Sequence, residues 1–589
     1  MPNLSDLYQI QWGQEKSAQT TTALQQYNFI TAHGCHFCIN IGSTIKVWQD
    51  NQYFALFNGY HLNDLKLKND AFLKQLSYGS QEQRIQWLKD TTGYFNLLII
   101  NKNSGEMFLA RDKYGCKPLY YSINAGSGTI SNYLAQFNRT QFSFDPIGLY
   151  ESIHYRWLSG KQTLETSIEQ IPAGYYGTIT DSKVQTTQYW YWHQLSNNKN
   201  SQQLSLNTAT EKVSKYLDEY FQLLEPQVNK VLIPLSGGVD SSILAAKAKQ
   251  HLGNKCVAGI IEFEDENPEL ETAIYFANTL NMPYRLIKYH NESILEDCKQ
   301  LVTHLEQLPR HYSSMPFYRL LNISDEFDAI IYGEPGDTFF GSHTIKRLLK
   351  QLKRMQLLKS LPVSLSTSNI LASTFPQIHT KVKNFQQTHL HQLIHSADKI
   401  AFSNIDTTIL ARLKDYYTEQ LDIDQQLPLE NEKQFNRLEQ HHQLSWIKTY
   451  MMITDIADHL VTAERLIKNK SVKLLTPLTY DKIAQASWQL SSKAYLGKDQ
   501  VKEVLRKIGC QYYSKESMYA PKYGFNTPKD KWLKILNTQF VTSLKSGYLI
   551  NKNIITQQQL DTFEQLSAEM RWTLYHLERY IQNASEHIN

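Results

Sequence analysis

The segment Ser236–Ser242, with the sequence SGGVDSS, has the composition of a loop that binds anions. It follows the apolar run 231–235, which predicts a buried strand, and it precedes a predicted helix. Adjacent glycines let backbone amides approach phosphate oxygens, while the helix dipole and the serine hydroxyls add further attraction. No Gly-Lys-Ser/Thr follows at Walker A spacing, so a P-loop is excluded. The segment therefore predicts a phosphate site of another kind.

Carboxylates in and near this loop predict a magnesium ion on the phosphates. Asp240 lies within the loop, and Mg²⁺ is usually held by one or two carboxylates together with phosphate oxygens. A second carboxylate is then expected at the end of another strand. The apolar run 330–332 is followed by Glu334 and Asp337, which meet this expectation. An acidic turn alone is usually a solvated loop, but beside a phosphate loop we favour the functional interpretation.

The elements that must position these residues form two regions. From about residue 28 to 190, short apolar runs predict a β-rich region, as in 53–57, which ends at the turn residues Asn58-Gly59. The polar stretch 196–203 is typical of a linker, so we expect domains at 1–200 and 205–589. Beyond the linker, strand and helix patterns alternate, which predicts a parallel, doubly wound sheet. The strands are expected at 231–235 and 257–261, with helical patterns at 212–224, 243–246 and 269–280 and throughout the region from about 345 onward.

Length and composition limit the function classes. The 589 residues exceed the roughly 250–300 that one hydrophobic core supports. The 60 Lys and Arg residues against 56 Asp and Glu provide no broad basic surface for nucleic acid. No apolar run reaches the roughly 20 residues of a membrane helix, and no targeting segment is apparent, so we expect a cytoplasmic protein without a membrane partner.

Six cysteines are too few for a disulfide framework in so long a chain. The cluster at residues 33–38, HGCHFC, has CxxC spacing, but no second pair follows to complete a tetrahedral metal site. We favour buried thiols in a strand.

Several segments together resemble the asparagine synthetase family. SGGVDSS matches the pyrophosphate-binding loop, and IIYGEPGDTFFG at 330–341 resembles the SGEGSDExFGG stretch. Weaker matches follow in family order at 476–478, 502–506 and 520–528. The resemblance implies an α/β fold: an N-terminal class II glutamine amidotransferase-like (Ntn) αββα domain and a C-terminal ATP-pyrophosphatase (adenine nucleotide alpha hydrolase-like) doubly wound parallel sheet with helical additions.

The resemblance also implies the site and its cofactors, ATP and Mg²⁺. Asp240 and Asp337 would hold the metal, and Glu334 and Lys522 would be catalytic, with Glu334 preparing an amine and Lys522 stabilising developing negative charge. The expected ATP-binding residues are Leu235, Ser236, Gly237, Gly238, Val239, Asp240, Ser241, Ser242, Ile260, Gly333 and Glu334. Pro335 and Ala520 depart from the family pattern, which has glycine and arginine there.

The N-terminal region resembles the glutaminase half of the family at 57–63 and at 110–121, ARDKYGCKPLYY. The family enzyme uses a cysteine exposed as the first residue, whereas position 2 is Pro2. We therefore expect this domain to be an inactive scaffold. Family members without that cysteine include β-lactam synthetases and lasso-peptide cyclases.

The leading hypothesis is an AMP-forming carbon–nitrogen ligase that adenylates a small-molecule or peptide carboxylate and captures it with a substrate amine, as in macrolactam or lasso-peptide cyclisation. The alternative is ammonia-dependent carboxamide formation on an amino acid or sugar acid. A substrate-presenting protein and a homodimer stay open as partners. A tRNA-modifying enzyme is disfavoured by the balanced charge, and a catalytically dead scaffold by the presence of all four site residues.

Overall fold

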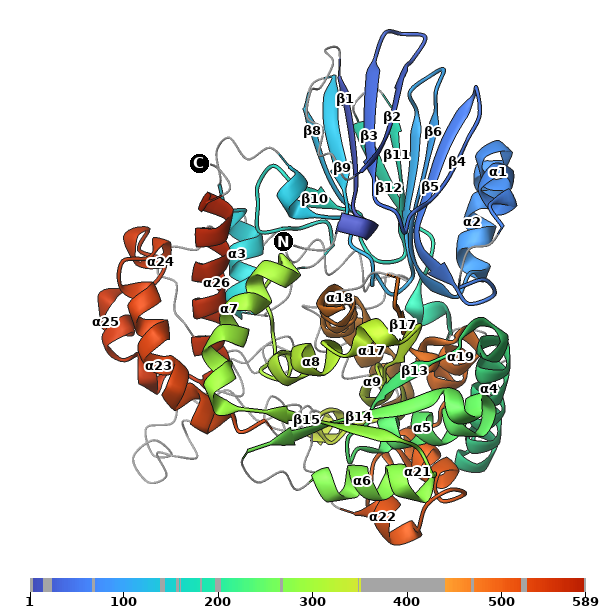
Figure 1. Ribbon diagram of the computed structural model, residues 1–589, viewed down its shortest axis with the longest axis vertical. Helices are drawn as coiled ribbons and strands as arrows, with labels where there is room; N and C mark the ends of the chain where they lie inside the picture. The colour runs from blue at the N-terminus through green and yellow to red at the C-terminus, as the bar shows by residue number, and fades with distance from the viewer. Residues whose placement is uncertain are drawn as a thin grey trace, which may run out of the picture.

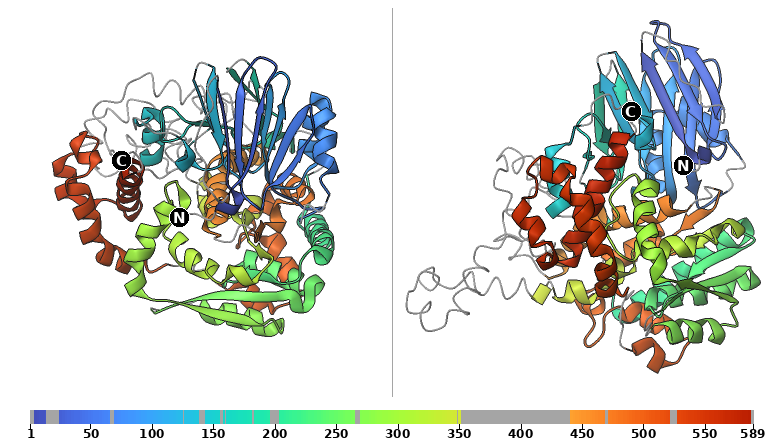
Figure 2. Two further views of the ribbon diagram at one scale, coloured as in Figure 1. Left: turned by 45° about the horizontal axis from the view of Figure 1, so that its top comes forward. Right: turned by 60° about the vertical axis from the view of Figure 1, so that its left-hand side comes forward.

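The computed structural model describes residues 4–586 with several gaps (Figure 1). The sandwich-like β region lies at one end of the molecule and a parallel sheet at the other, which both views of Figure 2 make clear. The residues outside the description are 1–3, 14–23, 66–68, 125, 138–142, 155–157, 159, 181–182, 196–202, 265–268, 348, 351–439, 468–470, 521–526 and 587–589.

Two antiparallel six-stranded sheets form the N-terminal region. The first has the strand order β10-β8-β9-β1-β3-β2, and the second β12-β11-β7-β6-β5-β4. Their strands are β1 (Tyr8–Gly13), β2 (Gln25–Ile30), β3 (His36–Ile41), β4 (Lys46–Gln49), β5 (Tyr53–His61), β6 (Gly93–Asn101), β7 (Met107–Arg111), β8 (Tyr120–Asn124), β9 (Ser127–Ser131), β10 (Glu169–Gln170), β11 (Tyr175–Thr180) and β12 (Lys183–Gln188).

The N-terminal region has a separate core on each face of its second sheet. Tyr8, Ile10 and Ile39 belong to the core between the sheets, because successive residues of a strand face opposite sides. Helices α1 (Ala71–Tyr78) and α2 (Gln81–Asp90) cover the second sheet, with Leu73 and Leu88 against Phe57. A third α-helix among the described residues of this region is α3 (Pro146–His154).

The predicted turn at Asn58-Gly59 is wrong. Both residues lie inside β5, paired with Asn96 and Phe95 of β6. At Gly59, φ is +131°, and a Cβ would lie 2.0 Å from the Tyr94 carbonyl oxygen. The glycine therefore permits a close approach between strands. The β region also begins earlier than the expected residue 28, because β1 is a central strand of the first sheet.

The C-terminal region is built on a five-stranded, all-parallel sheet with the order β15-β14-β13-β16-β17. The strands are β13 (Val231–Pro234), β14 (Cys256–Phe263), β15 (Tyr284–Tyr289), β16 (Ala329–Ile331) and β17 (Lys473–Leu475). The chain moves outward from β13 to β15 and then returns to β16 on the other side. This reversal creates a crevice at the carboxyl ends of β13 and β16, where ligands bind in such sheets.

Helices cover both faces of this sheet, with α5 and α6 on one side and α8 on the other (Figure 1). The expected strands and the helix through 243–246 are present, and the helix predicted at 269–280 is α6. The helices are α4 (Leu206–Leu224), α5 (Val239–Leu252), α6 (Leu270–Thr279), α7 (Ile294–Leu305), α8 (Ser314–Leu321), α9 (Gly336–Phe340), α17 (Gln440–Met451), α18 (Ala457–Leu466), α19 (Asp481–Trp488), α20 (Ser492–Leu496), α21 (Glu503–Gly509), α22 (Lys515–Tyr519), α23 (Lys529–Lys545), α24 (Tyr548–Asn551), α25 (Gln557–Asp561) and α26 (Ala568–Glu586).

No helix among the described residues has the length and apolarity needed to cross a membrane. The predicted linker falls almost entirely on 196–202, and the helical region expected from 345 onward includes 351–439, so most of both predictions lies outside the described residues.

The segment between β7 and β8 attaches the two regions to each other. Lys113 Nζ lies 2.7 Å from an Asp481 carboxylate oxygen, and the Tyr114 hydroxyl donates to the Thr479 carbonyl at 2.6 Å. Lys117 forms a buried ion pair with Glu464. One hydrophobic core continues across this junction, since Tyr60 and Tyr114 share a cluster with residues of the parallel-sheet region.

Tyr114→Phe should destabilise the protein, because the buried Thr479 carbonyl loses its donor at a cost of about 1–2 kcal/mol. Tyr78→Phe is the matched control: its hydroxyl also donates at 2.6 Å, to Asp50, but Tyr78 is 53% exposed, so water replaces the bond. Urea denaturation followed by tryptophan fluorescence measures both. Equal shifts of the two midpoints would contradict the assigned role of Tyr114.

Candidate active site

The glycine loop connects β13 to α5, and hydrogen bonds to its own serine side chains fix its backbone. The Gly238 amide donates to Ser236 Oγ at 3.1 Å, and the Ser236 amide donates to Ser241 Oγ at 3.2 Å. A Cβ on Gly237 would lie 3.1 Å from Glu269 Cβ, so this position is tightly enclosed. Gly238 is the N-cap of α5, which places the positive end of the helix dipole at the loop.

The loop opens on a cleft of about 410 Å³. The cleft lies at the carboxyl ends of the central strands, where the strand order predicts a ligand site. Nine of the predicted site residues line it: Leu235, Ser236, Gly238, Asp240, Ser241, Ile260, Gly333, Glu334 and Asp337. Of the other predicted ATP-binding residues, Gly237 packs against Glu269, and Val239 and Ser242 are buried in α5.

Asp240 and Asp337, the two predicted metal ligands, both pair with the ammonium of Lys502. The Lys502 side chain is only 2% exposed. Burial would lower its pKa, but the two carboxylates outweigh this effect and raise the pKa above its ordinary value. Lys502 also has a left-handed backbone, with φ of +60°, a conformation that costs free energy in a residue with a side chain. The sequence indicates Lys502 only as a member of a helix motif, not as a site residue.

The donor set around Asp240 fits a magnesium ion. Its Oδ2 pairs with Lys502, whereas its Oδ1 is buried and has no hydrogen-bond partner among the described residues. A buried carboxylate oxygen without a donor is costly, and a hard cation satisfies it. Asp337 is 46% exposed toward the cleft, so a phosphate-bound ion could reach both carboxylates.

Glu334 lies in the same cleft beside a cluster of imidazoles. Its Oε1 is 3.4 Å from His459 Nδ1, and His459 Nε2 is 3.8 Å from Asp455 Oδ1. His311 Nε2 lies 3.7 Å from the same Asp455 oxygen. Burial would lower the pKa of His459, but Asp455 and Glu334 raise it to about 9. The nearby imidazoles hold the pKa of Asp455 below its ordinary value despite burial.

His311, Asp455 and His459 are not among the residues predicted from the sequence. The i,i+4 spacing of Asp455 and His459 could have indicated that these two side chains act together, because it places both on one helix face. A π-helical turn, Met452–Ile456, joins α17 to α18 and carries Asp455. His311 lies in the loop before α8, and nothing in its local sequence connects it with the other two.

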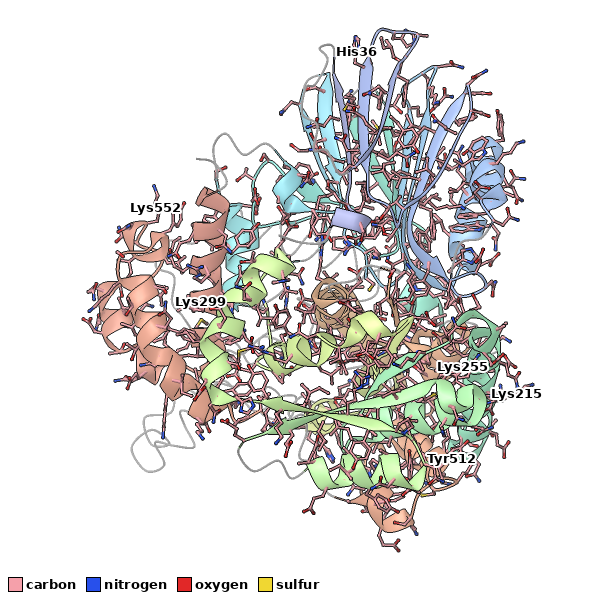
Figure 3. The ribbon with its side chains drawn as sticks, in the orientation of Figure 1. His36, Lys215, Lys255, Lys299, Tyr512 and Lys552 are labelled. Atoms are coloured by element: carbon pink, nitrogen blue, oxygen red, sulfur yellow. The ribbon has the colours of Figure 1, made fainter. Side chains whose placement is uncertain are left out.

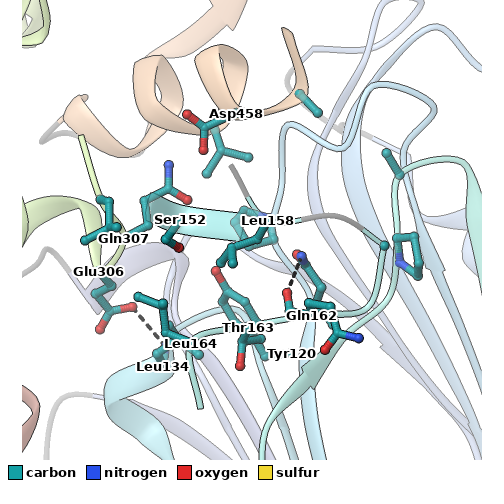
Figure 4. A pocket seen from close by; sticks show the side chains of 18 of the residues that line it. Tyr120, Leu134, Ser152, Leu158, Gln162, Thr163, Leu164, Glu306, Gln307 and Asp458 are labelled. Atoms are coloured by element: carbon teal, nitrogen blue, oxygen red, sulfur yellow. Dashed lines mark hydrogen bonds between the residues drawn. The ribbon is translucent and has the colours of Figure 1, made fainter. Parts of the chain in front are cut away.

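A second, smaller cavity lies between the two regions of the molecule (Figure 4). Asp458 reaches it from α18, and Glu306 accepts a hydrogen bond from the Leu134 amide at 2.9 Å along its edge. Arg310 and Asp458 form an ion pair of 2.5 Å in its lining. Each of these two residues is adjacent in sequence to a histidine that lines the cleft.

The remaining predictions fall elsewhere. Lys522 and Pro2 lie outside the described residues. His36, next to the CxxC cysteines, is at the outer tip of the β region in Figure 3, away from the cleft. Cys38 is buried in β3 as expected, whereas Cys35 precedes the strand and is only half-buried.

Gly336→Ala should weaken MgATP binding by at least about tenfold, equivalent to about 1.4 kcal/mol. The added Cβ would lie 2.5 Å from Asp240 Cγ, so the carboxylate must move. Gly79→Ala, between α1 and α2 in the N-terminal region, is the control, since its Cβ would meet Gln75 O and Gln83 Oε1 at 3.1 Å and no residue of the cleft. Calorimetric titration measures both affinities. An unchanged affinity in Gly336→Ala would remove Asp240 from the nucleotide site.

Comparison with known proteins agrees with this architecture. The asparagine synthase family model matches residues 227–582, and the glutamine amidotransferase domain model matches 78–190. Asparagine synthetase [glutamine-hydrolyzing] 1 of Bacillus subtilis is 20% identical over 559 residues, covering 88% of this chain and 80% of the relative. A putative asparagine synthetase of Mycobacterium tuberculosis is 20% identical over 551 residues, covering 85% and 79%. Amidase chry2 of Gibberella zeae is 24% identical over 280 residues, covering 44% and 41%.

These matches confirm the expected fold class, an amidotransferase-like region followed by an ATP-pyrophosphatase-like parallel sheet. They support an ATP-dependent ligase as the class of activity. Because the first family match spans more than half of the 589 residues, the chain belongs to the asparagine synthase family.

Proposed function

We propose that this ligase adenylates a substrate carboxylate with ATP, releases pyrophosphate, and joins the activated carboxylate to an amine of a specialised substrate. The observation that carries the proposal is the convergence of the glycine loop, Asp240, Asp337 and Glu334 on one cleft. A site that holds phosphates beside a candidate base suits attack at phosphorus followed by amine capture.

The residues that line the cleft fall into groups with distinct proposed roles. The serine hydroxyls of the loop 236–241 and the N-terminal end of α5 would bind the β- and γ-phosphates and leave the α-phosphorus open to the carboxylate. Asp240 and Asp337 would hold Mg²⁺, which neutralises phosphate charge when bound. Lys502 keeps these two carboxylates together before the nucleotide arrives, because its buried ammonium offsets their mutual repulsion.

Glu334 is the proposed base for the amine. An ammonium cannot attack until it loses a proton, and Glu334 faces the cleft with a side chain that is 24% exposed. The contact with His459 fixes one carboxylate oxygen and leaves the other for the substrate. Lys522 would stabilise the charge that develops in the activated carboxylate, as the family resemblance implies.

We infer that glutamine hydrolysis in the N-terminal region does not supply the nitrogen. All six cysteines of the sequence are among the described residues. Burial raises the pKa of Cys35, and it raises that of Cys116 well above the ordinary value. Cys116 instead donates to the Leu460 carbonyl at 3.4 Å, in the junction between the two regions. Neither thiol has the lowered pKa of a nucleophile.

Two nitrogen sources compete in this proposal. Capture by an amine of the same or a second substrate molecule, as in macrolactam or lasso-peptide cyclisation, requires no internal ammonia source. Carboxamide formation from free ammonia is the alternative, and the names of the asparagine synthetase relatives favour it. We place the first ahead, because it explains an amidotransferase-like region without a reactive thiol.

Carboxylate-dependent exchange of labelled pyrophosphate into ATP should disappear in Asp240→Asn, with a loss of at least about 100-fold, since the negative charge and one of the two carboxylate oxygens are removed. Asp561→Asn, on the exposed surface of α25, should retain full exchange. A panel of amino acids, sugar acids and peptides supplies the carboxylate. Exchange that survives in Asp240→Asn would exclude this carboxylate as a metal ligand.

Mass spectrometry of the products distinguishes the two nitrogen sources. With the best carboxylate of the panel and MgATP, we expect a product that has lost one water without added ammonia, which indicates an internal or intermolecular amide. A product in which the carboxylate hydroxyl is replaced by an amino group, formed only with ammonium, would support the alternative. Turnover with glutamine as the sole donor would overturn the inactive-glutaminase inference.

A further inference from the structure

Three side chains in the wall of the cleft have the atoms and spacing of a metal site. His311 Nε2 and His459 Nε2 lie 3.7 and 3.8 Å from Asp455 Oδ1, and one ligand atom from each residue lies within 4.8 Å of the others. Ligand atoms about 2.0–2.2 Å from a shared zinc ion would be about 3.3–3.6 Å apart in a tetrahedral site. Small side-chain rotations therefore suffice to bring all three onto one ion.

The orientation of His459 matches that of a metal-bound imidazole. Its Nε2 faces Asp455, and its Nδ1 faces Glu334 Oε1 at 3.4 Å on the opposite side. A metal-ligating histidine usually presents its second nitrogen to a carboxylate, which orients the ring and strengthens the ligand. Both nitrogens are buried and make no hydrogen bond with any described residue, so an ion would satisfy Nε2.

The charged residues around the cluster leave the Asp455 carboxylate available as a metal ligand. Asp458, one turn beyond Asp455 on the same helical segment, is paired with Arg310 at 2.5 Å. The ion pairs of Asp455 among the described residues are those with the two imidazoles. Within the described ranges no other group of three histidine, cysteine, aspartate or glutamate side chains has ligand atoms this close together.

We propose that His311, Asp455 and His459 bind one divalent transition-metal ion such as Zn²⁺, with an open coordination position directed into the cleft beside Glu334. Two imidazoles and one carboxylate favour Zn²⁺ or Co²⁺ over Mg²⁺, which prefers oxygen ligands. This site is separate from the proposed Mg²⁺ site at Asp240 and Asp337. The proposal does not rest on the proposed function, because metal binding here requires neither a nucleotide nor a carboxylate substrate.

Titration of the metal-free full chain with Co²⁺ tests the proposal. Excess Mg²⁺ is present to occupy oxygen-only sites, and visible d–d absorption reports imidazole coordination. We expect one equivalent of absorbing Co²⁺ that Zn²⁺ displaces. His459→Gln and Asp455→Asn should each lose this equivalent, and Glu334→Gln should weaken it by about 10- to 100-fold through the orientation of His459.

His251→Gln is the matched control. His251 Nε2 lies 2.7 Å from an Asp218 carboxylate oxygen, but the same oxygen lies 2.8 Å from the Lys247 ammonium, which repels a cation. This variant should bind Co²⁺ as the unaltered protein does. If His459→Gln fails to fold, as judged by circular dichroism, His311→Gln replaces it, since His311 lies at the cleft wall and is 36% exposed. Equal Co²⁺ binding in the unaltered protein and the folded cluster variants, or no imidazole-type absorption at all, would show that the cluster is only a network of ion pairs.

Discussion

The shared ion pair of Lys502 with Asp240 and Asp337 is the interaction on which the cleft depends. The two carboxylates follow neighbouring strands, β13 and β16, and would repel each other without a cation between them. Removing one partner of such a buried group leaves an uncompensated charge, which typically costs about 3–5 kcal/mol. The strained backbone of Lys502 is consistent with this role, because packing and charge must together hold it in place.

The beginning of α21 also connects the Lys502 ion pair to the segment that follows this helix. Arg506, one turn beyond Lys502, donates to the Val501 carbonyl at 2.9 Å and to the Met518 carbonyl in α22. One motif thus attaches the phosphate loop to the segment that leads toward Lys522. Lys502 and Arg506 could not exchange places. Lys502 supplies a point charge to two carboxylates, whereas the planar guanidinium of Arg506 donates to two carbonyls.

Contiguous motifs could be predicted from the sequence, whereas contacts between distant segments could not. The glycine loop and the Glu334–Asp337 turn each follow an apolar strand, so local pattern and strand order place them at one sheet edge. The bond between Lys502 and Asp240 joins positions 262 residues apart, and His311 meets His459 only through tertiary packing. The error at Asn58-Gly59 has the same origin: pairing with β6 overrides a local turn preference.

The 110–121 segment shows why an amidotransferase-like motif need not signify glutamine chemistry. Lys113, Tyr114, Cys116 and Lys117 all contact the parallel-sheet region, through an ion pair or a hydrogen bond to residues 460–481. These side chains are therefore required for the junction whether or not the region hydrolyses anything. Packing contacts of this kind account for the motif without reference to glutamine hydrolysis.

The cleft, rather than the smaller cavity, is where the proposed amine would meet Glu334. Arg310 and Asp458 line the smaller cavity as an ion pair, and the adjacent residues His311 and His459 line the cleft. In the proposed reaction, an amine carried by the carboxylate substrate or by a second molecule would reach Glu334 in the cleft, and the imidazole cluster, which contacts Glu334 through His459, would lie beside that incoming group.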